Sequence, residues 1–209
     1  MKIKQANQIT GGLSSPSKMP CHGFSITAKA CITGQKLRNV VGSICSKCYA
    51  LKGRYGFPNV QKALETRLAN LFHPDWVAAM STLIHKKEKS GYFRWHDSGD
   101  LQSVLHLRNI VEVCMRTPNI QHWLPTREFS IVSEYVEEFG PLPKNLTVRL
   151  SALMFDGPAP VAVAKRLGLT TSGASKQDFS CPASKQDNKC GECRACWNPA
   201  VANVNYKAH

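Results

Sequence analysis

Cysteine placement is the feature of this chain that most limits how it can fold. Eight of the nine cysteines form two groups of four, one near each end: Cys21, Cys31, Cys45 and Cys48, then Cys181, Cys190, Cys193 and Cys196. Four thiolates are the usual ligand set of a structural zinc ion or of an iron–sulfur cluster. The two groups therefore predict two metal-binding loops that staple the fold.

The second group is the more specific of the two. It contains the run CGECRAC, whose C-x2-C-x2-C spacing is that of ferredoxin-type cluster loops. We expect a [4Fe–4S] cluster there. At the first group, where only Cys45 and Cys48 are closely spaced, we expect either a [4Fe–4S] cluster or zinc. The ninth cysteine, Cys114, lies in an apolar helical segment and is expected in the core.

Disulfides are the alternative explanation for the cysteines. The first twenty residues lack the charged leader and apolar stretch of a secretory signal peptide. No apolar run approaches the roughly 18 residues that a membrane-spanning helix needs. We therefore expect a reduced, cytoplasmic protein that does not enter a membrane. In that setting, clustered cysteines bind metal more often than they form disulfides.

Charge indicates the kind of partner. Among 209 residues, 27 Lys and Arg outnumber 14 Asp and Glu, which gives a net charge of +13. The basic residues are spread along the chain, so we expect a folded basic face, with Lys47, Lys52, Arg54 and Arg94 as candidates. Nucleic acid, with DNA favoured over RNA, is the expected partner, and solubility alone is the alternative explanation.

Apolar periodicity along the chain alternates between strands and helices. The expected strands are 23–32, 92–97, 120–125, 146–155 and 169–175, and the expected helices are 58–72, 74–89, 103–116, 129–140 and 159–168. Residues 1–20 are expected to be an irregular arm, and residues 181–198 a metal loop. Alternation of this kind predicts parallel βαβ units in a single α/β domain.

Chain length limits the architecture of that domain. A full (β/α)8 barrel needs about 250 residues, which is more than this chain supplies. We therefore expect an abbreviated or open (β/α) barrel with two metal-binding loops, and a small doubly wound sheet is the alternative.

Polar residues gather just after the expected strands, where parallel α/β folds place their sites. The densest run is RWHDSGDLQS, residues 94–103. Asp97 and Asp100 are candidates for a nucleophile and an acid or base, and His96 for a proton shuttle. Asp156, after strand 146–155, is the reserve nucleophile. The substrate-binding candidates in the run are Ser98, Gly99 and Gln102. The alternative is that one of the acids caps the following helix.

Two short motifs resemble those of the tRNA-guanine transglycosylases. DSGDLQ, residues 97–102, is similar to that family's D-S-G-G-F/Y-Q signature, and LPTR, residues 124–127, is similar to its LPTR motif. The resemblance implies an incomplete (β/α)8 barrel with a thiolate metal site, which exchanges guanine for a 7-deazaguanine base. It also implies that Asp97 and Gln102 bind the base and that Asp97 transfers a proton. The DNA 7-deazaguanine transglycosylases of phages and bacteria catalyse this exchange in DNA.

A second resemblance lies in the N-terminal cysteine region. PCHGFSITAKAC and ICSKCYALKGRYGFPNVQKA, residues 20–31 and 44–63, resemble a group of small phage proteins of unassigned function. Those proteins are similar to radical S-adenosylmethionine barrels in their cysteine-rich N-terminal loops and in a C-x2-C-Y segment. The resemblance implies a phage protein working in the host cytoplasm, with a divergent radical S-adenosylmethionine enzyme as a further alternative.

Two classes of function follow. The first is an enzyme that exchanges a base in DNA, in which attack by Asp97 at C1′ splits a difficult displacement into two easier steps. In such an enzyme arginines would hold phosphate and an aromatic ring would stack on a flipped base. The candidates for these roles are Arg94, Arg127 and Arg149, and Trp95, Trp123 and Tyr49. The second class is a metal-stapled protein that binds nucleic acid without catalysis.

Overall fold

A six-stranded parallel sheet forms the centre of the fold. The structure is a computed structural model, and it describes residues 1–208. The strands follow one another across the sheet in chain order, and every neighbouring pair is parallel. They are β1 (Gly23–Phe24), β2 (Tyr92–Trp95), β3 (Gln121–Thr126), β4 (Leu146–Ser151), β5 (Thr170–Ser175) and β6 (Asn203–Lys207). The sheet is open, with β1 and β6 at its two edges.

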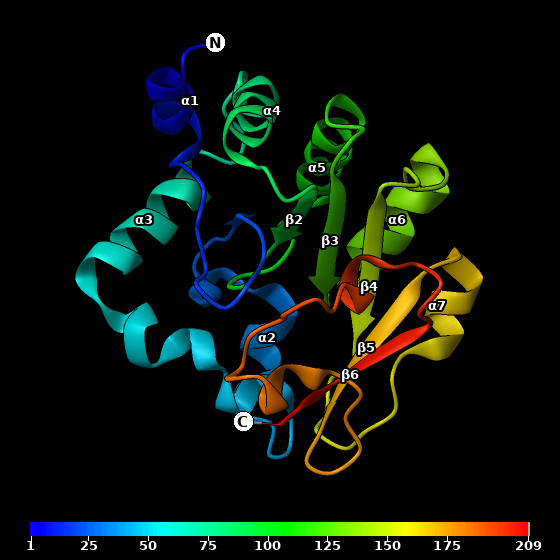
Figure 1. Cartoon of the computed structure of the whole chain (residues 1–209). Helices are drawn as coiled ribbons and strands as arrows, with labels where there is room; N and C mark the ends of the chain where they lie inside the picture. The colour runs from blue at the N-terminus through cyan, green and yellow to red at the C-terminus, as the bar shows by residue number, and fades with distance from the viewer. Residues whose placement is uncertain (209) are drawn as a thin grey trace.

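Helices connect the strands and cover one face of the sheet. They are α3 (Pro58–Ala69), α4 (Trp76–Lys87), α5 (Val104–Arg116), α6 (Phe129–Phe139) and α7 (Val161–Leu167). Parallel crossovers are right-handed, so strands in chain order place their helices on the same side (Figure 1). α5 begins where Ser103 Oγ accepts a hydrogen bond from the His106 N–H. Cys114 on this helix is fully buried, which confirms its predicted place in the core.

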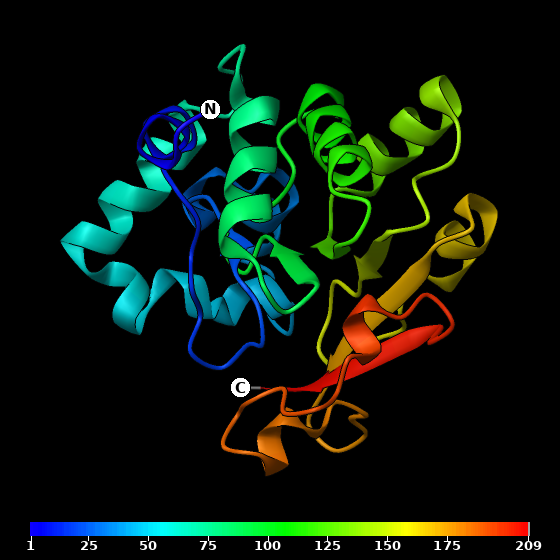
Figure 2. The same cartoon turned by 45° about the horizontal axis from the view of Figure 1, so that its top comes forward.

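The two faces of the sheet carry different side chains because side chains alternate along a strand. Phe93 and Trp95 of β2 belong to the main core with the helices. Arg94 and Trp123, which are in register on β2 and β3, belong to the opposite face. Residues 181–201 cross that face (Figure 2), and the Trp197 Nε1–H donates a 2.9 Å hydrogen bond to the Phe93 carbonyl.

Four of the five predicted strands and the five predicted helices are confirmed, with bounds that differ by a few residues. The predicted strand 23–32 is wrong beyond Phe24, because Ala28–Ala30 form a 3-10 turn and α2 (Ile32–Leu37) begins at Ile32. The strand order never reverses, which excludes the doubly wound alternative. The predicted irregular arm is wrong, because α1 (Ile3–Thr10) lies there. Ala6 and Ile9 of α1 pack against Ala79 and Leu83 of α4, so tertiary packing stabilises a helix that its polar sequence does not predict.

Short turns fill the chain between β1 and α3, at the carboxyl end of the sheet. They are η1 (Ala28–Ala30), α2 (Ile32–Leu37), η2 (Ile44–Lys47), η3 (Tyr49–Leu51) and η4 (Gly53–Gly56). Two backbone hydrogen bonds of 2.9 Å, from Ile44 N–H to the Leu153 carbonyl and from Phe155 N–H to the Gly42 carbonyl, tie these turns to the end of β4. No helix in residues 1–208 has both the length and the apolar character needed to cross a membrane.

Candidate metal centres

Three cysteines of the first group lie together in the turns that follow β1. Cys31 stands between η1 and α2, Cys45 lies in η2, and Cys48 follows η2 directly. A Cβ atom placed on Gly34 would lie 3.6 Å from Sγ of Cys31 and 3.7 Å from Sγ of Cys45. Cys48 is close enough to Cys31 for its charge to act on that thiol. We call Cys31, Cys45 and Cys48 the three-cysteine site.

The surroundings of this site favour protonated thiols when no metal is bound. Burial raises the pKa of Cys31 and of Cys45. The nearby Asp100 and Glu128 carboxylates raise both pKa values further, whereas Arg127 lowers that of Cys45. Metals bind the thiolate form, so a metal that binds here must displace protons.

Glu128 anchors the site to the end of β3. Its two carboxylate oxygens accept hydrogen bonds from the N–H and the Oγ1 hydroxyl of Thr33, at 2.8 and 2.7 Å. The side chain of Glu128 is buried, so these bonds are shielded from water. Thr33 belongs to the first turn of α2, and the contact therefore fixes the neighbouring Cys31 over the carboxyl ends of the strands.

Asp100 links the ends of β2 and β3. Oδ1 accepts hydrogen bonds from the Thr126 hydroxyl at 2.6 Å and from the Leu101 N–H at 2.8 Å, and Oδ2 accepts one from the Arg127 N–H at 2.9 Å. Burial raises the pKa of Asp100 to about 6, although these hydrogen bonds lower it. Asp100, a predicted nucleophile, acid or base, thus uses its hydrogen bonds to join the ends of neighbouring strands.

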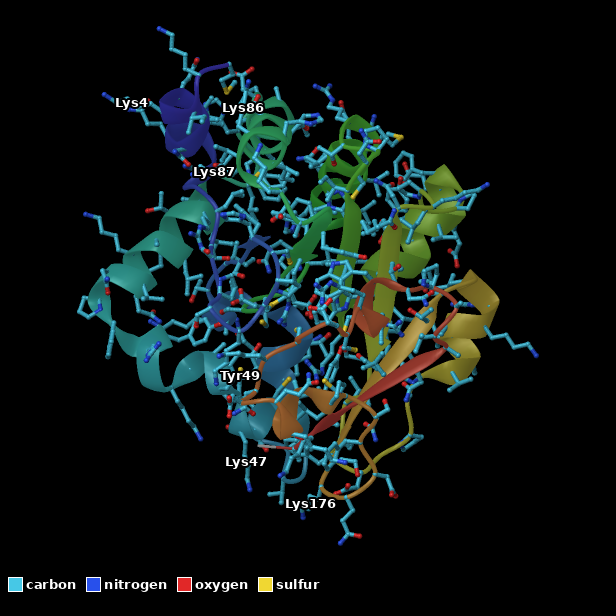
Figure 3. All side chains as sticks on the ribbon, in the orientation of Figure 1. Lys4, Lys47, Tyr49, Lys86, Lys87 and Lys176 are labelled. Atoms are coloured by element: carbon cyan, nitrogen blue, oxygen red, sulfur yellow. The ribbon has the colours of Figure 1, made fainter. Side chains whose placement is uncertain are left out.

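Asp97 lies beside the residue that follows Cys48. Tyr49 donates a hydrogen bond to the Asp97 carbonyl, and Tyr55 donates one to Oδ2 at 2.8 Å. The other oxygen, Oδ1, is buried and has no hydrogen-bond partner among the described residues. Tyr49 lies at the carboxyl end of the sheet, with the exposed Lys47 nearby (Figure 3). Asp97 is therefore the predicted carboxylate that combines closeness to the three-cysteine site with a free acceptor.

The second cysteine group converges on one small cavity. The cavity has a volume of about 20 Å³, and Trp197 and all four cysteines line it. Its cysteines are Cys181, Cys190, Cys193 and Cys196, which we call the quartet. Tyr206 of β6 lies 3.3 Å from Sγ of Cys196 through its hydroxyl. The predicted convergence of these four side chains is present in the fold.

Cys21 lies with the quartet and not with the three-cysteine site. It packs in the same cluster as Cys196 and Trp123, and Cys190 is among the groups that act on its thiol. The expected first group of four is therefore a group of three. Cys21 also lines a cavity of about 460 Å³ on the amino side of β1, together with His22 and Glu88. His22 and Glu88 form an ion pair of 3.1 Å there if His22 is protonated.

Neither cysteine group is a ready-made cage. Within residues 1–208, no three His, Cys, Asp or Glu side chains are already arranged to hold a single metal ion. The residue types of both groups nevertheless suit a metal. Each group brings at least three thiols together, and thiolates are the ligands of zinc ions and of iron–sulfur clusters. The first group offers three thiols, which is one fewer than a closed structural site uses.

Comparison with known proteins gives the family. The family described as Gene product 88 matches residues 1–199, which include both cysteine groups. The chain belongs to this family. No curated protein and no solved structure matches it.

The remaining polar residues of the run 94–103 mostly support the fold. His96 is 4% exposed, burial holds its pKa well below the usual value, and neither ring nitrogen has a partner among the described residues. A neutral, enclosed imidazole is poorly placed for the predicted proton shuttle. Ser98 is buried, and a Cβ on Gly99 would overlap Ile26. Gln102 donates from Nε2 to the Ala30 carbonyl at 3.3 Å, which supports the turn before Cys31.

The arginines and tryptophans predicted to contact phosphate or to stack on a base differ in their burial and contacts. Arg149 is fully buried and Trp95 likewise, while Trp123 is 4% exposed with the Arg94 guanidinium 4.5 Å above its ring. These side chains are not free to contact a nucleic acid. Arg127 donates from Nε to the Ala152 carbonyl at 3.0 Å beside the three-cysteine site. It is the predicted arginine that stays closest to that site.

Asp156, the predicted reserve nucleophile, lies in a surface turn. Asp156 is exposed in the turn after β4, and it accepts hydrogen bonds from Ser175 and the Lys176 N–H at 2.8 and 2.9 Å. These hydrogen bonds lower the pKa of Asp156.

Tyr206, beside the quartet, is a site residue that the sequence analysis missed. Its strand, β6, has the polar sequence NVNYK and lacks a clear strand pattern.

Proposed function

We propose that the chain is an iron–sulfur enzyme whose reaction centre is the three-cysteine site. The observation that carries this proposal is the convergence of Cys31, Cys45 and Cys48 in the turns after β1, with the sulfurs of Cys31 and Cys45 flanking Gly34. Three thiolates on a four-iron cluster leave one iron without a protein ligand. A metal with an open position is typical of catalysis, whereas a fully ligated metal is typical of structure.

The arrangement of the strands supports the same proposal. Six parallel strands in chain order, with polar loops at their carboxyl ends, are what an open (β/α) barrel requires. The phage proteins that the N-terminal segments resemble are similar to radical S-adenosylmethionine barrels in their cysteine-rich N-terminal loops and in a C-x2-C-Y segment. The cluster would supply reductive cleavage of S-adenosylmethionine. The chain itself would hold the site through Glu128 and Asp100.

A nucleic acid is the substrate class that the charge favours. The net charge is +13, and the exposed Lys47 and Lys176 lie near the carboxyl end of the sheet (Figure 3). Such charge attracts polyanions by releasing their counterions. A base of DNA is the substrate that we favour within this class.

Metal analysis and cofactor cleavage together test the proposal. The chain would be reconstituted anaerobically with iron and sulfide, and iron, sulfide and the release of 5′-deoxyadenosine from S-adenosylmethionine under a one-electron reductant would be measured. Replacing Cys31, Cys45 and Cys48 by Ala should remove one cluster's share of iron and abolish cleavage. Cys114→Ala is the matched control and should change neither. Cleavage that survives the triple replacement would overturn the proposal.

Base exchange through a carboxylate is the second candidate, and the free Oδ1 of Asp97 favours it. Asp97 would attack C1′ as the bond from C1′ to guanine breaks, and guanine would leave with a proton taken from water. The incoming 7-deazaguanine would then displace the carboxylate and return its own N9 proton to water. Asp97→Asn should keep the fold and the metal content but lose incorporation of labelled 7-deazaguanine into DNA. Equal incorporation by the parent and the variant would exclude this mechanism.

A further inference from the structure

Arg149 is a fully buried guanidinium that fixes the loop of the quartet. It stands on β4, and its nitrogens donate to five backbone carbonyls at distances of 2.7 to 3.1 Å. These carbonyls belong to Thr171, Ala195, Cys196, Asn198 and Val201. Two of the five lie at or next to Cys196, and Asn198 and Val201 follow in the same loop, so this one side chain ties the loop to the sheet along the path that Figure 1 shows.

The charge of Arg149 has no carboxylate partner. The ion pairs among residues 1–208 join His22 to Glu88 and Arg116 to Glu112, and neither includes Arg149. A buried charge is costly unless an opposite charge or a metal centre lies beside it. Carbonyl dipoles offset only part of this cost. We therefore expect a negatively charged group other than a carboxylate close to Arg149.

Among residues 1–208, the acidic side chains that act on Arg149 are a thiol and a phenol. Cys196 and Tyr206 are the groups whose negative charge would act on the Arg149 guanidinium. Arg94, on the same face of the sheet, has an unpaired buried Nε and is a charge neighbour of Cys21, Cys190 and Cys196. Two guanidinium groups therefore act on Cys196, which lines one cavity with the other three quartet cysteines. Four thiolates around a doubly positive ion or core leave a net charge of about −2.

We propose that the quartet binds a metal as a doubly negative thiolate centre, and that Arg149, assisted by Arg94, is its counter-ion. Zinc and an oxidised four-iron cluster both give this charge, and metal analysis distinguishes them. Arg149 is thus a positioning residue for the centre and not only a support for the backbone. The proposal concerns the quartet and does not depend on the reaction at the three-cysteine site.

Two substitutions at one position separate charge from hydrogen bonding. Arg149→Lys keeps the positive charge but loses most of the five hydrogen bonds. Arg149→Gln keeps polar contacts but loses the charge. Both would be made in the full chain with Cys31, Cys45 and Cys48 replaced by Ala, so that only metal at the quartet is measured. Arg166→Gln, on the exposed side of α7, is the matched control.

Metal retention against a competing chelator is the main measurement. The Gln variant should release metal about tenfold more readily than the Lys variant, because coupled charges typically interact at this level. Denaturation with and without metal gives the second measurement: Arg149→Gln should destabilise the metal-bound chain more than the metal-free chain. Equal retention by the two variants, or equal destabilisation with and without metal, would show a backbone clamp only and overturn the proposal.

Two further results make the test complete. If the quartet holds an iron–sulfur cluster, Arg149→Gln should lower its midpoint potential relative to Arg149→Lys, because a nearby cation favours the reduced, more negative form. If neither Arg149 variant folds, the same pair at the less buried Arg94 decides, with Gln again expected to release metal more readily than Lys. A quartet that binds no metal in the parent chain would also overturn the proposal.

Discussion

Acidification from pH 7 to pH 5 should destabilise this protein through its buried histidines. His106 and His122 are fully buried, and burial lowers the pKa of each from 6.5 to about 3. The folded chain therefore keeps both rings neutral at pH 5, whereas the unfolded chain protonates them. A lowered folded-state pKa contributes stability that is present above pH 6.5 and is lost as the pH falls towards 3.

The magnitude follows from these two pKa values. Each pH unit below 6.5 costs about 1.4 kcal/mol per histidine, so each ring costs about 2 kcal/mol at pH 5 and the pair about 4 kcal/mol. Asp100 acts in the opposite direction, because its folded pKa of about 6 lets the folded chain gain a proton between pH 7 and pH 5. The proton bound by folded Asp100 offsets about 1 kcal/mol of the stability lost through the histidines. The net expected loss from these groups is about 3 kcal/mol.

Urea denaturation followed by tryptophan fluorescence measures this loss. The chain has four tryptophans, and all of them are buried. Comparing the parent with His106→Asn isolates one histidine, because loss of metal at low pH affects both proteins. Asn keeps an acceptor for the Gln102 N–H, which bonds to His106 Nδ1 at 3.3 Å, but does not titrate.

The variant should lose about 2 kcal/mol less than the parent between pH 7 and pH 5. His85→Asn, at an exposed position, should lose as much as the parent. The reasoning fails if His106→Asn and the parent show the same acid-induced loss.

Three further predictions concern the turns after β1 and the basic surface. Gly34→Ala should lower iron bound at the three-cysteine site, because its Cβ would lie 2.8 Å from Cβ of Cys31; Gly56→Ala, with nothing within 4 Å, should bind iron normally, and equal iron in both would contradict this. Glu128→Gln should lower the free energy of unfolding by about 1–3 kcal/mol through the weakened contact with Thr33, whereas the exposed Glu134→Gln should not; urea denaturation compares them. DNA affinity should fall steeply between low and high salt in a filter-binding assay, and an affinity that salt leaves unchanged would exclude a phosphate-driven partner.

Sequence periodicity was sufficient for the helices and strands of the main core. Val148 and Leu150, for example, alternate with Thr147 and Arg149 on β4, and a strand with this pattern is recognisable without its neighbours. α1 and β6 were missed because packing partners far away in the chain stabilise them. Ala6 and Ile9 depend on α4, and β6 depends on its five-residue register with β5.

The sequence was enough to single out the cysteines and arginines of the candidate sites. It was not enough to predict which of them lie together in the fold. Cys21 is close to Cys31 in sequence, yet β1 lies between them, so one precedes the strand and the other follows it. Arg149 was predicted to hold phosphate, because a basic residue on a strand carries no local signal that distinguishes a ligand contact from an internal clamp. Only the return of residues 181–201 over the sheet shows which role its surroundings allow.

The hydrogen bond between Trp197 and Phe93 joins residues 104 positions apart, and it has a consequence for biogenesis. The supports of the three-cysteine site, from Thr33 to Leu153, are all synthesised before the quartet exists. Tyr206, whose hydroxyl contacts Sγ of Cys196, is added later still. If both groups bind metal as we propose, the three-cysteine site can be loaded while the quartet is still being synthesised, and a chain whose quartet stays without metal would lack one support of the loop over the Arg94 face of the sheet.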